Sequence, residues 1–579
     1  MELICRLPVA PRALFDCGEN EVVLVFDQGL ARVRAGQLDW LKRGEMGGAV
    51  RDAHGALCCT IGTQIVFLEE GKAAEPQELN AAFGGPLGGS RRVSVTPDGD
   101  LWVEGCPKRR RLDGSYTDVP PGPAPSPLPL AVDLHANLWT LTSEGQVAVL
   151  PVDAPEAWQL LPAEGGPWQW LVADHVGCVW VGGEAGLRRL DPHHPARGWQ
   201  VVEVLASAPT ALGLSPDDLV LMGLATGEVL EVDFSAKGEV SARLLARAPG
   251  PVQALHSDGR GAIWAATAEG LYRCGPAAEA WQHAWEKLGR LPGSNHDIFA
   301  APLQGVLYVA GGLTADWGLP ARSHVFDELW AFAPQTGCWE LVSHMSFPRR
   351  YNGIAVLDGR VWVVGGEGEI KTSAHPEGER ITVDVVDIYD PASGVWAEGP
   401  RLNNVRTDPF VMAEAGRIWA VGGACNPTTP IATVESLAPG ETAWRYEQPL
   451  PVPTRQGGCC ALDGVLYCVS TEGFFAFDTA ARQWLTGLPQ LEKSPMAALV
   501  TAFAGEVWVM GGHLSKATWR YAPAEHCWRP GPPLPTVQSW GAAAVLEGRL
   551  YIAGGAHWSE SHQRFVFDDR TYVLRPGWG

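Results

Sequence analysis

Cationic and hydrogen-bonding side chains recur in the C-terminal half of the chain at a fixed distance before a repeated glycine pair. Counting 15 or 16 residues back from each pair leads to Asn295/His296, Arg349/Arg350, Arg406/Thr407, Thr454/Arg455, Pro495/Met496 and Gln538/Ser539. Lys493, Tyr351 and Trp540 stand close to these positions. Because a forked guanidinium group binds carboxylates well, the pattern predicts a site for a carboxylate-bearing ligand. The alternative is that these arginines brace loops or pair with nearby carboxylates of the chain itself.

Other residues have the chemical types of metal ligands or of acid–base groups. The candidates for a metal are His513, His557, Glu560 and His562. Imidazole and carboxylate groups bind divalent metals, but this spacing matches no known ligand motif, so we favour surface histidines and predict no cofactor. Enzyme signatures such as HExxH, GxSxG and Gx4GK[ST] do not occur in the sequence. If the chain is nevertheless an enzyme, His296, Asp297 and Glu367 are the acid–base candidates.

A repeated phrase must position these side chains. GRVWVVGG at 359–366 returns as GRIWAVGG (416–423), GEVWVMGG (505–512) and GRLYIAGG (548–555). Aligning the units on the aromatic residue of the phrase gives gaps of 54, 57, 48, 41 and 43 residues between Tyr308, Trp362, Trp419, Tyr467, Trp508 and Tyr551. Periods of this length are typical of solenoids, propellers and other repeat folds.

One unit predicts its own four strands. GIAVLDG (353–359) and RVWVVGG (360–366) form a hairpin pattern across an Asp-Gly turn. VDVVDIYD (383–390) alternates apolar and polar residues as a half-buried strand does, and VWAEGP (395–400) follows a short turn. The glycine pair lets the chain bend sharply and lets neighbouring units approach closely. Each unit is therefore expected to be a four-stranded antiparallel meander.

These features resemble kelch-repeat β-propellers across six units, over residues 286–579. The fourth unit departs from the pattern with Ser470-Thr471 at the glycine pair, and in the sixth Tyr572 stands in place of the fourth-strand Trp. The resemblance implies that the predicted binding residues share the mouth of a ring, where arginines of kelch proteins contact acidic peptides. The segments after the glycine pairs lie at the same end, and three of them are expected to be long loops: Leu313–His324, Glu367–Arg380 and Ala424–Ile431.

The N-terminal half repeats a different phrase, in which an apolar-Trp-apolar strand precedes a tight Gly turn. Aligning on Val23, Cys58, Trp102, Trp139, Trp180, Val220 and Trp264 gives a mean spacing of (264 − 23)/6, about 40 residues. The pattern D-x-x-G-x-x-W-x-G…GL-x-x-LDP, clearest at 174–192, resembles the repeats of bacterial sensor-type, two-component-regulator-like propellers. We therefore expect a bacterial protein.

The two halves together predict an all-β chain of two tandem β-propellers with four-stranded antiparallel blades. The first domain, 1–285, is expected to have seven blades, with Trp281 in its last strand. The second domain, 286–579, is expected to be a six-bladed propeller of the kelch type.

Composition limits the partners and the compartment. A net charge of −21 argues against nucleic acid as a partner, because such binding needs a basic field. No apolar run is as long as a membrane span, and no signal peptide is apparent, so we expect no membrane partner. The 13 cysteines include no CxxC pair, and several lie in apolar strands. Reduced thiols in the core and a cytoplasmic location are therefore expected.

Two classes of function stay open on these grounds. The favoured one is a non-enzymatic binding or scaffold protein that uses both propellers for protein–protein interaction. Its kelch mouth would bind an acidic peptide or a small anionic ligand. The alternative is a kelch-type enzyme, epimerase-like, mutarotase-like or metal-dependent, that acts on a carbohydrate or another small anion. A carboxylate or histidine with a shifted pKa deep in the mouth would favour the enzyme, and an open, arginine-lined mouth would favour the binding protein.

Overall fold

A computed structural model describes residues 2–577 apart from these positions: 8, 10, 12, 19–20, 52–56, 62–63, 70–71, 74–76, 79–92, 96–99, 104–105, 107, 112–114, 121–130, 135–136, 143, 152–156, 162–165, 193–196, 204–207, 216–217, 235–238, 258–261, 275–283, 292, 294, 315–323, 371–378 and 560–563. The described chain is all β-structure and connecting turns, without an α-helix. No helix capable of spanning a membrane therefore occurs in the described ranges. The chain divides into two compact units, one formed mainly by residues 1–282 and the other mainly by residues 283–579.

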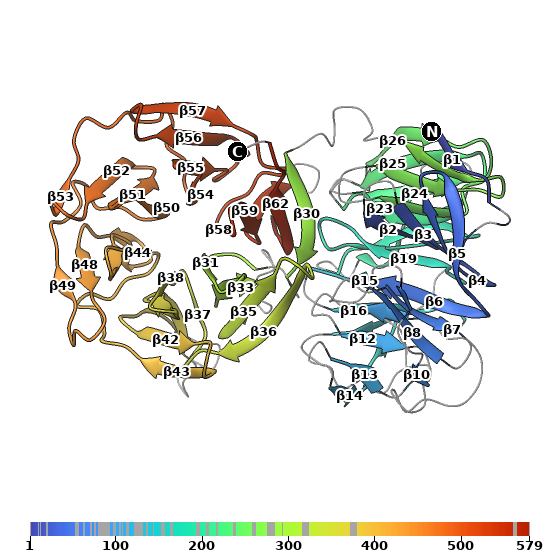
Figure 1. Ribbon diagram of the computed structural model, residues 1–579, viewed down its shortest axis with the longest axis horizontal. Coiled ribbons are helices and arrows are strands. Elements are labelled where there is room, and N and C mark those ends of the chain that lie inside the picture. Colours follow the sequence, from blue (N-terminus) through green and yellow to red (C-terminus); the bar gives the residue numbers. More distant parts are fainter. Residues whose placement is uncertain are drawn as a thin grey trace. The chain divides into compact units, whose positions relative to one another are not determined.

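The C-terminal unit contains six four-stranded antiparallel sheets within its described residues, which are the blades of a β-propeller (Figure 1). The blades, numbered 1 to 6 and given from the innermost strand outward, are β31 (Ala300–Leu303), β32 (Val306–Ala310), β35 (Glu328–Ala333) and β36 (Cys338–His344); β38 (Gly353–Leu357), β39 (Arg360–Val364), β42 (Val386–Asp390) and β43 (Val395–Glu398); β44 (Phe410–Glu414), β45 (Arg417–Val421), β48 (Val434–Leu437) and β49 (Arg445–Tyr446); β50 (Gly458–Leu462), β51 (Val465–Ser470), β52 (Gly473–Asp478) and β53 (Gln483–Trp484); β54 (Leu499–Phe503), β55 (Glu506–Met510), β56 (Thr518–Ala522) and β57 (Cys527–Gly531); and β58 (Ala542–Leu546), β59 (Arg549–Ala553), β62 (Arg570–Leu574) and β30 (Trp285–Arg290).

The six innermost strands close a ring, because each contacts the next and β58 contacts β31. The glycine pair makes this approach possible, as predicted. At Gly365, with φ 63°, a Cβ would lie 2.7 Å from the carbonyl oxygen of Arg406 in the following blade. At Gly366, with φ 113°, it would lie 2.8 Å from the carbonyl oxygen of Arg350. A side chain at either position would collide with backbone, so glycine is required.

Ring closure corrects the expectation for the sixth unit. Tyr572 lies in the third strand of blade 6, β62, and the fourth strand of that blade is β30 from the start of the unit. The fourth-strand Trp is therefore present, as Trp285. Its side chain is fully buried, and its indole N–H donates to the carbonyl oxygen of Pro533 at 3.1 Å. The two ends of the unit are thus joined in one sheet.

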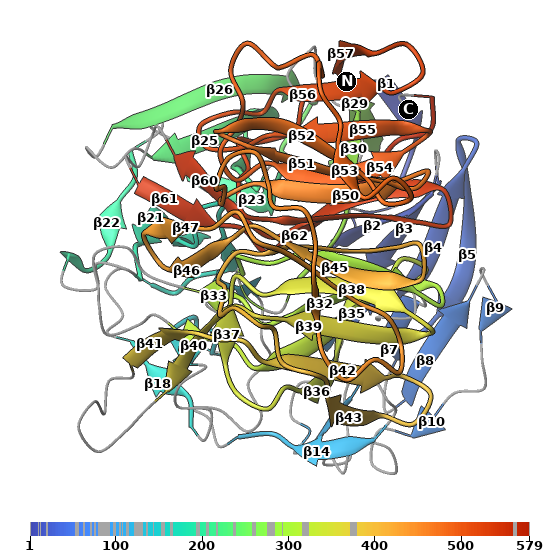
Figure 2. The ribbon, with the colours of Figure 1, turned by 90° about the vertical axis from the view of Figure 1, so that its left-hand side faces the viewer.

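The segments after four of the glycine pairs are β-hairpins rather than irregular loops. They lie on one face of the unit, at the left in Figure 2, and belong to blades 1, 2, 3 and 6. The paired strands are β33 (Leu313–Thr314) with β34 (His324–Val325); β40 (Glu367–Ile370) with β41 (Glu379–Thr382) and with β37 (Arg349–Arg350); β46 (Ala424–Asn426) with β47 (Thr429–Pro430); and β60 (Ala556–Ser559) with β61 (Arg564–Phe567). The connections of blades 4 and 5, 470–473 and 511–517, are described in full and contain no additional hairpin between the second and third strands.

The N-terminal unit contains seven sheets within its described residues, and each of the seven alignment positions lies in the second strand of one sheet. The sheets are β2 (Ala13–Gly18), β3 (Glu21–Phe26), β4 (Gly29–Arg34) and β5 (Gln37–Arg43); β6 (Met46–Arg51), β7 (Leu57–Ile61), β8 (Gln64–Glu69) and β10 (Gln77–Glu78), with β9 (Lys72–Ala73) also on β8; β11 (Val93–Val95), β12 (Leu101–Val103), β13 (Lys108–Arg110) and β14 (Tyr116–Asp118); β15 (Ala131–Val132), β16 (Leu138–Leu141), β17 (Val147–Leu150) and β18 (Gln159–Leu160); β19 (Trp170–Ala173), β20 (Val179–Gly183), β21 (Gly186–Leu190) and β22 (Gln200–Val201); β23 (Pro209–Leu214), β24 (Val220–Leu224), β25 (Glu228–Phe234) and β26 (Val240–Arg247); and β27 (Ala254–Ser257), β28 (Ile263–Ala266), β29 (Leu271–Cys274) and β1 (Glu2–Cys5).

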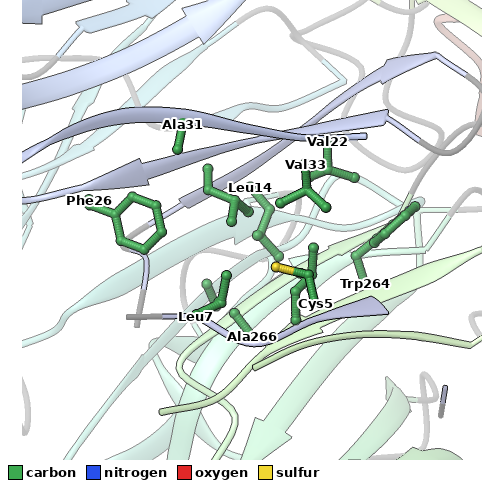
Figure 3. Packing of buried hydrophobic residues seen from close by; sticks show 12 residues of the cluster. Cys5, Leu7, Leu14, Val22, Phe26, Ala31, Val33, Trp264 and Ala266 are labelled. Atoms are coloured by element: carbon green, nitrogen blue, oxygen red, sulfur yellow. The ribbon is translucent and has the colours of Figure 1, made fainter. Parts of the chain in front are cut away.

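The last of these sheets also corrects an expectation. Its fourth strand is β1, paired with β29, and not a strand that contains Trp281, which lies outside the described residues. Figure 3 shows the resulting core, where Cys5 of β1 and Trp264 of β28 belong to one buried cluster with Val22 and Phe26 of the first sheet. Within the sheet that contains β20, the buried Asp174 carboxylate accepts the indole N–H of Trp180 at 2.7 Å and holds this side chain in the core.

Replacing the strand-closing Trp tests the closure of the kelch unit. Trp285→Ala in the full chain should lower the free energy of unfolding of the C-terminal unit by about 3–5 kcal/mol, because it leaves a cavity in a packed core. Urea unfolding followed by circular dichroism measures the change. Trp519→Ala is the control, since that side chain is 39% exposed. Equal effects of the two substitutions would contradict a closing role for β30.

Candidate binding site

A belt of left-handed residues surrounds the mouth of the C-terminal ring. Two or three residues before the innermost strand of each blade, one residue has a φ between 50° and 63°, and these residues are Asp297, Tyr351, Asp408, Gln456, Ala497 and Trp540. They repeat with the gaps of the aligned aromatic residues, 54, 57, 48, 41 and 43. Such a backbone conformation costs on the order of 1–3 kcal/mol for a residue other than glycine, so the surrounding structure must hold it.

Hydrogen bonds between neighbouring units hold the belt. In five of the six steps, the backbone N–H of one member donates to the backbone carbonyl of the previous one: Tyr351 to Asp297 (3.2 Å), Asp408 to Tyr351 (2.9 Å), Ala497 to Gln456 (2.8 Å), Trp540 to Ala497 (3.1 Å) and Asp297 to Trp540 (2.9 Å). In the sixth step the N–H of Gln456 donates to the carboxylate Oδ2 of Asp408. The belt therefore closes, and one side chain completes it.

Residues two positions before the belt brace their own blade. Asn295 donates to the carbonyl of Gly311 at 2.9 Å, and Gln538 donates to that of Gly554. Arg349 donates to the carbonyls of Gly365 (3.5 Å) and Val385 (3.4 Å), on either side of the hairpin connection. Arg406 does the same with Gly422 (3.0 Å) and Thr433 (3.2 Å). In blade 4, Thr454 and Ser470 share a hydroxyl hydrogen bond.

Arg349 and Arg406 therefore have the bracing role, which was the alternative to ligand contact. Both side chains are fully buried, Arg349 against Asp387 and Arg406 against Glu435. Burial lowers the pKa of Arg349 to about 10, although Asp387 acts in the opposite sense. Burial also lowers the pKa of Arg406, against the effect of Glu435. Their guanidinium groups have no face left for a ligand.

Residues one position before the belt point the other way, since neighbouring side chains of an extended segment alternate. Their backbones pair with the start of the hairpins, as between His296 and Leu313, Arg350 and Glu367, or Ser539 and Ala556. Ser539 is buried, and its hydroxyl donates to the carbonyl of Ala556 at 3.1 Å.

Asp297 is the centre of an ionic cluster on blades 1 and 2. His296 Nδ1 lies 2.8 Å from its Oδ1, and Arg350 donates to its Oδ2 at 3.1 Å. Arg350 also donates twice to Oε1 of Glu367, at 2.9 and 3.0 Å. Burial alone would lower the pKa of Arg350, but Asp297 and Glu367 outweigh it and the pKa is raised. Burial and Asp297 raise the pKa of Tyr351 well above its usual value. Arg350 is therefore already neutralised by carboxylates of the chain.

Asp408, the belt residue that sequence reasoning missed, carries the most unusual carboxyl of the mouth. Burial raises its pKa to about 7, and the charge of Asp297 adds to this, while the Gln456 N–H and Arg455 act in the opposite sense. A carboxyl with this pKa changes its protonation near neutral pH. The repeat spacing contained the signal, because Asp408 occupies the same register position as Asp297 and Tyr351.

The remaining candidates separate into exposed cations and packed aromatic groups. Lys493 is exposed, and Arg455 is partly exposed and donates to the carbonyl of Pro427. Neither forms an ion pair with a carboxylate of the described residues. Trp540 lies beside His513, with ring centroids 6.0 Å apart, and His513 lies 5.3 Å from Phe565.

Of the four metal candidates, the structure describes His513 and His557, and each has its own neighbours. His557 is buried and lies 3.8 Å from Asp568, which is itself paired with Arg570 at 2.6 Å. His513 packs against aromatic rings instead, and Glu560 and His562 lie outside the described residues. No group of three or more potential metal ligands occurs in the part of the chain that the structure describes.

No protein-family model matches the chain. It is similar to Kelch-like protein 35 of Mus musculus, with 26% identity over 304 residues that cover 51% of this chain and 42% of that protein. It is also similar to beta-scruin of Limulus polyphemus (22% identity, 41% of this chain, 22% of that protein) and to Kelch-like protein 25 of Xenopus tropicalis (22% identity, 41% of each). The chain thus spans less than half the length of these relatives.

Among solved structures, the structure of YjhT is similar at a TM-score of 0.40 and 14% identity, over 48% of this chain and 95% of that one. The fold defines an all-β protein of two tandem β-propellers. Repeats, blade topology and curated relatives agree that its C-terminal unit is a kelch-repeat β-propeller.

Removing a bracing arginine tests its structural role. Arg406→Leu should lower the free energy of unfolding of the C-terminal unit by about 3–5 kcal/mol, because Glu435 would stay buried without its counter-charge. Arg401→Leu is the matched control, since the Arg401 side chain is 56% exposed beside Asp384. There we expect less than about 1 kcal/mol. Urea unfolding of the full chain measures both, and a small loss for Arg406→Leu would contradict the assignment.

The carboxyl of Asp408 makes stability depend on pH. Its pKa is raised from 3.8 to about 7, so the folded state retains a proton that the unfolded chain releases. Ionisation of Asp408 therefore lowers the free energy of unfolding as pH rises from about 4 to about 7, and its contribution is constant above that window. Asp408→Asn keeps an oxygen for the Gln456 N–H but does not titrate.

Relative to the wild type, Asp408→Asn should therefore gain on the order of 2–3 kcal/mol between about pH 5 and about pH 8, at roughly 1.4 kcal/mol per pK unit. Urea unfolding of both proteins at the two pH values measures the difference. A difference that does not change with pH would show that Asp408 titrates normally.

Proposed function

We propose that the protein is a binding or scaffold protein that uses its two propellers for protein–protein interaction, and that its kelch mouth binds an acidic peptide of a partner. The observation that carries the proposal is the distribution of cations around the mouth. Arg349 and Arg406 are buried against carboxylates within their own blades, and Arg350 is neutralised by Asp297 and Glu367. Lys493 and Arg455 keep their charge for an external carboxylate, which a guanidinium or ammonium group binds well.

The architecture supports a binding role. A ring of blades is a rigid scaffold, and connections at one end of such a scaffold are where binding residues concentrate. The similarity to Kelch-like proteins and scruins supports protein interaction as the general function. The net charge of −21 disfavours nucleic acid as a partner, and a cytoplasmic location remains part of this proposal.

A second candidate is a kelch-type enzyme that acts on a carbohydrate or another small anion. One observation favours it, since Asp408 with a pKa of about 7 stands near the Asp297 carboxylate. A carboxyl group with a pKa near neutrality is suited to general acid–base chemistry. His296, held by Asp297 through Nδ1, would be the second proton-transfer group.

Charge reversal at the two available cations tests the binding role. The probe is a short fluorescein-labelled poly-glutamate peptide, titrated with the full chain at low ionic strength. Arg455→Glu/Lys493→Glu should weaken binding by at least about tenfold, which corresponds to the loss of about 1.4 kcal/mol or more in charge-assisted contacts. Fluorescence anisotropy measures the dissociation constant.

Arg401→Glu/Arg445→Glu is the matched control, because both side chains are 56% exposed, in the outer part of their blades. Equal weakening in the two double variants would reduce the effect to net charge and contradict a site at the mouth. If no peptide binds and the purified protein instead retains a small anionic compound, the second candidate replaces the first.

A further inference from the structure

The wall of hairpins around the kelch mouth is interrupted at blades 4 and 5. Hairpins follow the glycine pairs of blades 1, 2, 3 and 6, whereas blades 4 and 5 turn back within 470–473 and 511–517. Hairpins therefore border the mouth on every side except at these two neighbouring blades. We call the tops of these two blades, with the segment 491–496 between them, the open sector.

Leu514 occupies the open sector in a conformation that its own residue type disfavours. It lies in the short connection of blade 5 with φ 58°, and its side chain is 58% exposed. A bulky aliphatic residue in the left-handed region is a backbone outlier, and such outliers concentrate at functional sites. Because the leucine side chain is exposed in the free protein, the favourable free energy of burying it is not realised there. A partner that covers Leu514 would recover this free energy.

Trp519 is a second exposed apolar residue of blade 5, on the side of the blade that faces blade 4. It lies two residues before Tyr521 on β56, so the two side chains share a face of the strand. Tyr521 packs into blade 4, with ring centroids 6.0 Å from Tyr467 and 4.9 Å from Phe474. Trp519 therefore lies over the seam between the two blades, where neither has a hairpin to cover it, and is 39% exposed.

Exposed charged residues lie on the same part of the ring. Lys493 and Lys516 are exposed, and Arg455 is partly exposed, all within or beside the open sector. Glu472 and Glu492 are exposed there as well, so the sector has a small excess of positive charge in a protein of net charge −21. Charge complementarity thus selects an acidic occupant, and the apolar pair selects one that carries an apolar side chain.

We propose that the open sector, formed by blades 4 and 5, docks an acidic peptide segment of a partner protein whose apolar side chain covers Leu514 and Trp519. This inference rests on the proposed binding function and adds the place on the ring and the kind of segment. The hairpins of the other four blades then form the wall that orients the segment.

Two labelled peptides of equal charge separate the contributions. One is glutamate-rich with a central Phe-Leu pair, and the second has Ser-Ser at the same place. The wild-type chain should bind the Phe-Leu peptide at least fivefold more tightly than the Ser-Ser peptide. In Leu514→Ala/Trp519→Ala this preference should fall below twofold, while binding of the Ser-Ser peptide stays within twofold of the wild type.

Val395→Ala/Tyr446→Ala is the matched control, because these apolar side chains are 60% and 55% exposed on the outer strands of blades 2 and 3. The control should retain the full preference, and circular dichroism checks that each variant folds. The inference is overturned if the wild type shows no preference, or if the preference survives in Leu514→Ala/Trp519→Ala. Loss of the preference in the outer-strand control as well would also overturn it.

The proposed function fails separately, when neither peptide responds to Arg455→Glu/Lys493→Glu.

Discussion

The hydrogen-bonded belt around the kelch mouth is the constraint on which the rest of the site depends. Each member adopts a left-handed conformation that a residue other than glycine avoids, and each is held by the member before it. Because the bonds run from blade to blade and return to the start, no blade can shift radially without breaking one. The belt thus sets the position of every side chain that precedes it.

The belt also divides the predicted binding residues into two roles. Arg349 and Arg350 are neighbours in the sequence, and their side chains leave the strand in opposite directions. Arg349 turns into the blade and is fully buried, whereas Arg350 turns to the mouth and joins Asp297 and Glu367. Residue type alone does not distinguish the two, because both positions carry arginine. The distinction comes from the register relative to the belt.

The repeat architecture could be predicted from the sequence, whereas the contacts between distant segments could not. The aromatic spacing predicted the blades, because each aromatic residue packs within or beside its own sheet. The role of Trp285 could not be read in the same way, since its partner strand lies at the opposite end of the unit. The pKa of Asp408 likewise depends on burial and on Asp297, which belongs to another blade. Contacts between units that are distant in sequence leave no local signal.

One local signal does report on the shape of the mouth. The arginine braces bond carbonyls on both sides of a hairpin connection, as Arg406 does with Gly422 and Thr433. A long donor at this position can therefore fasten the two ends of a hairpin base, and the blades with hairpins carry asparagine, arginine or glutamine there.

Blades 4 and 5 carry Thr454 and Pro495 instead, and their connections are short. Thr454 hydrogen-bonds the side chains of the nearby Ser470 and Glu472, and a proline side chain has no donor at all. The position two residues before the belt therefore differs between the blades with hairpins, where it carries a long donor, and blades 4 and 5, where it does not. A ring whose scaffold is regular but whose braces are not presents one open direction, and that asymmetry distinguishes one sector of a repetitive fold from the others.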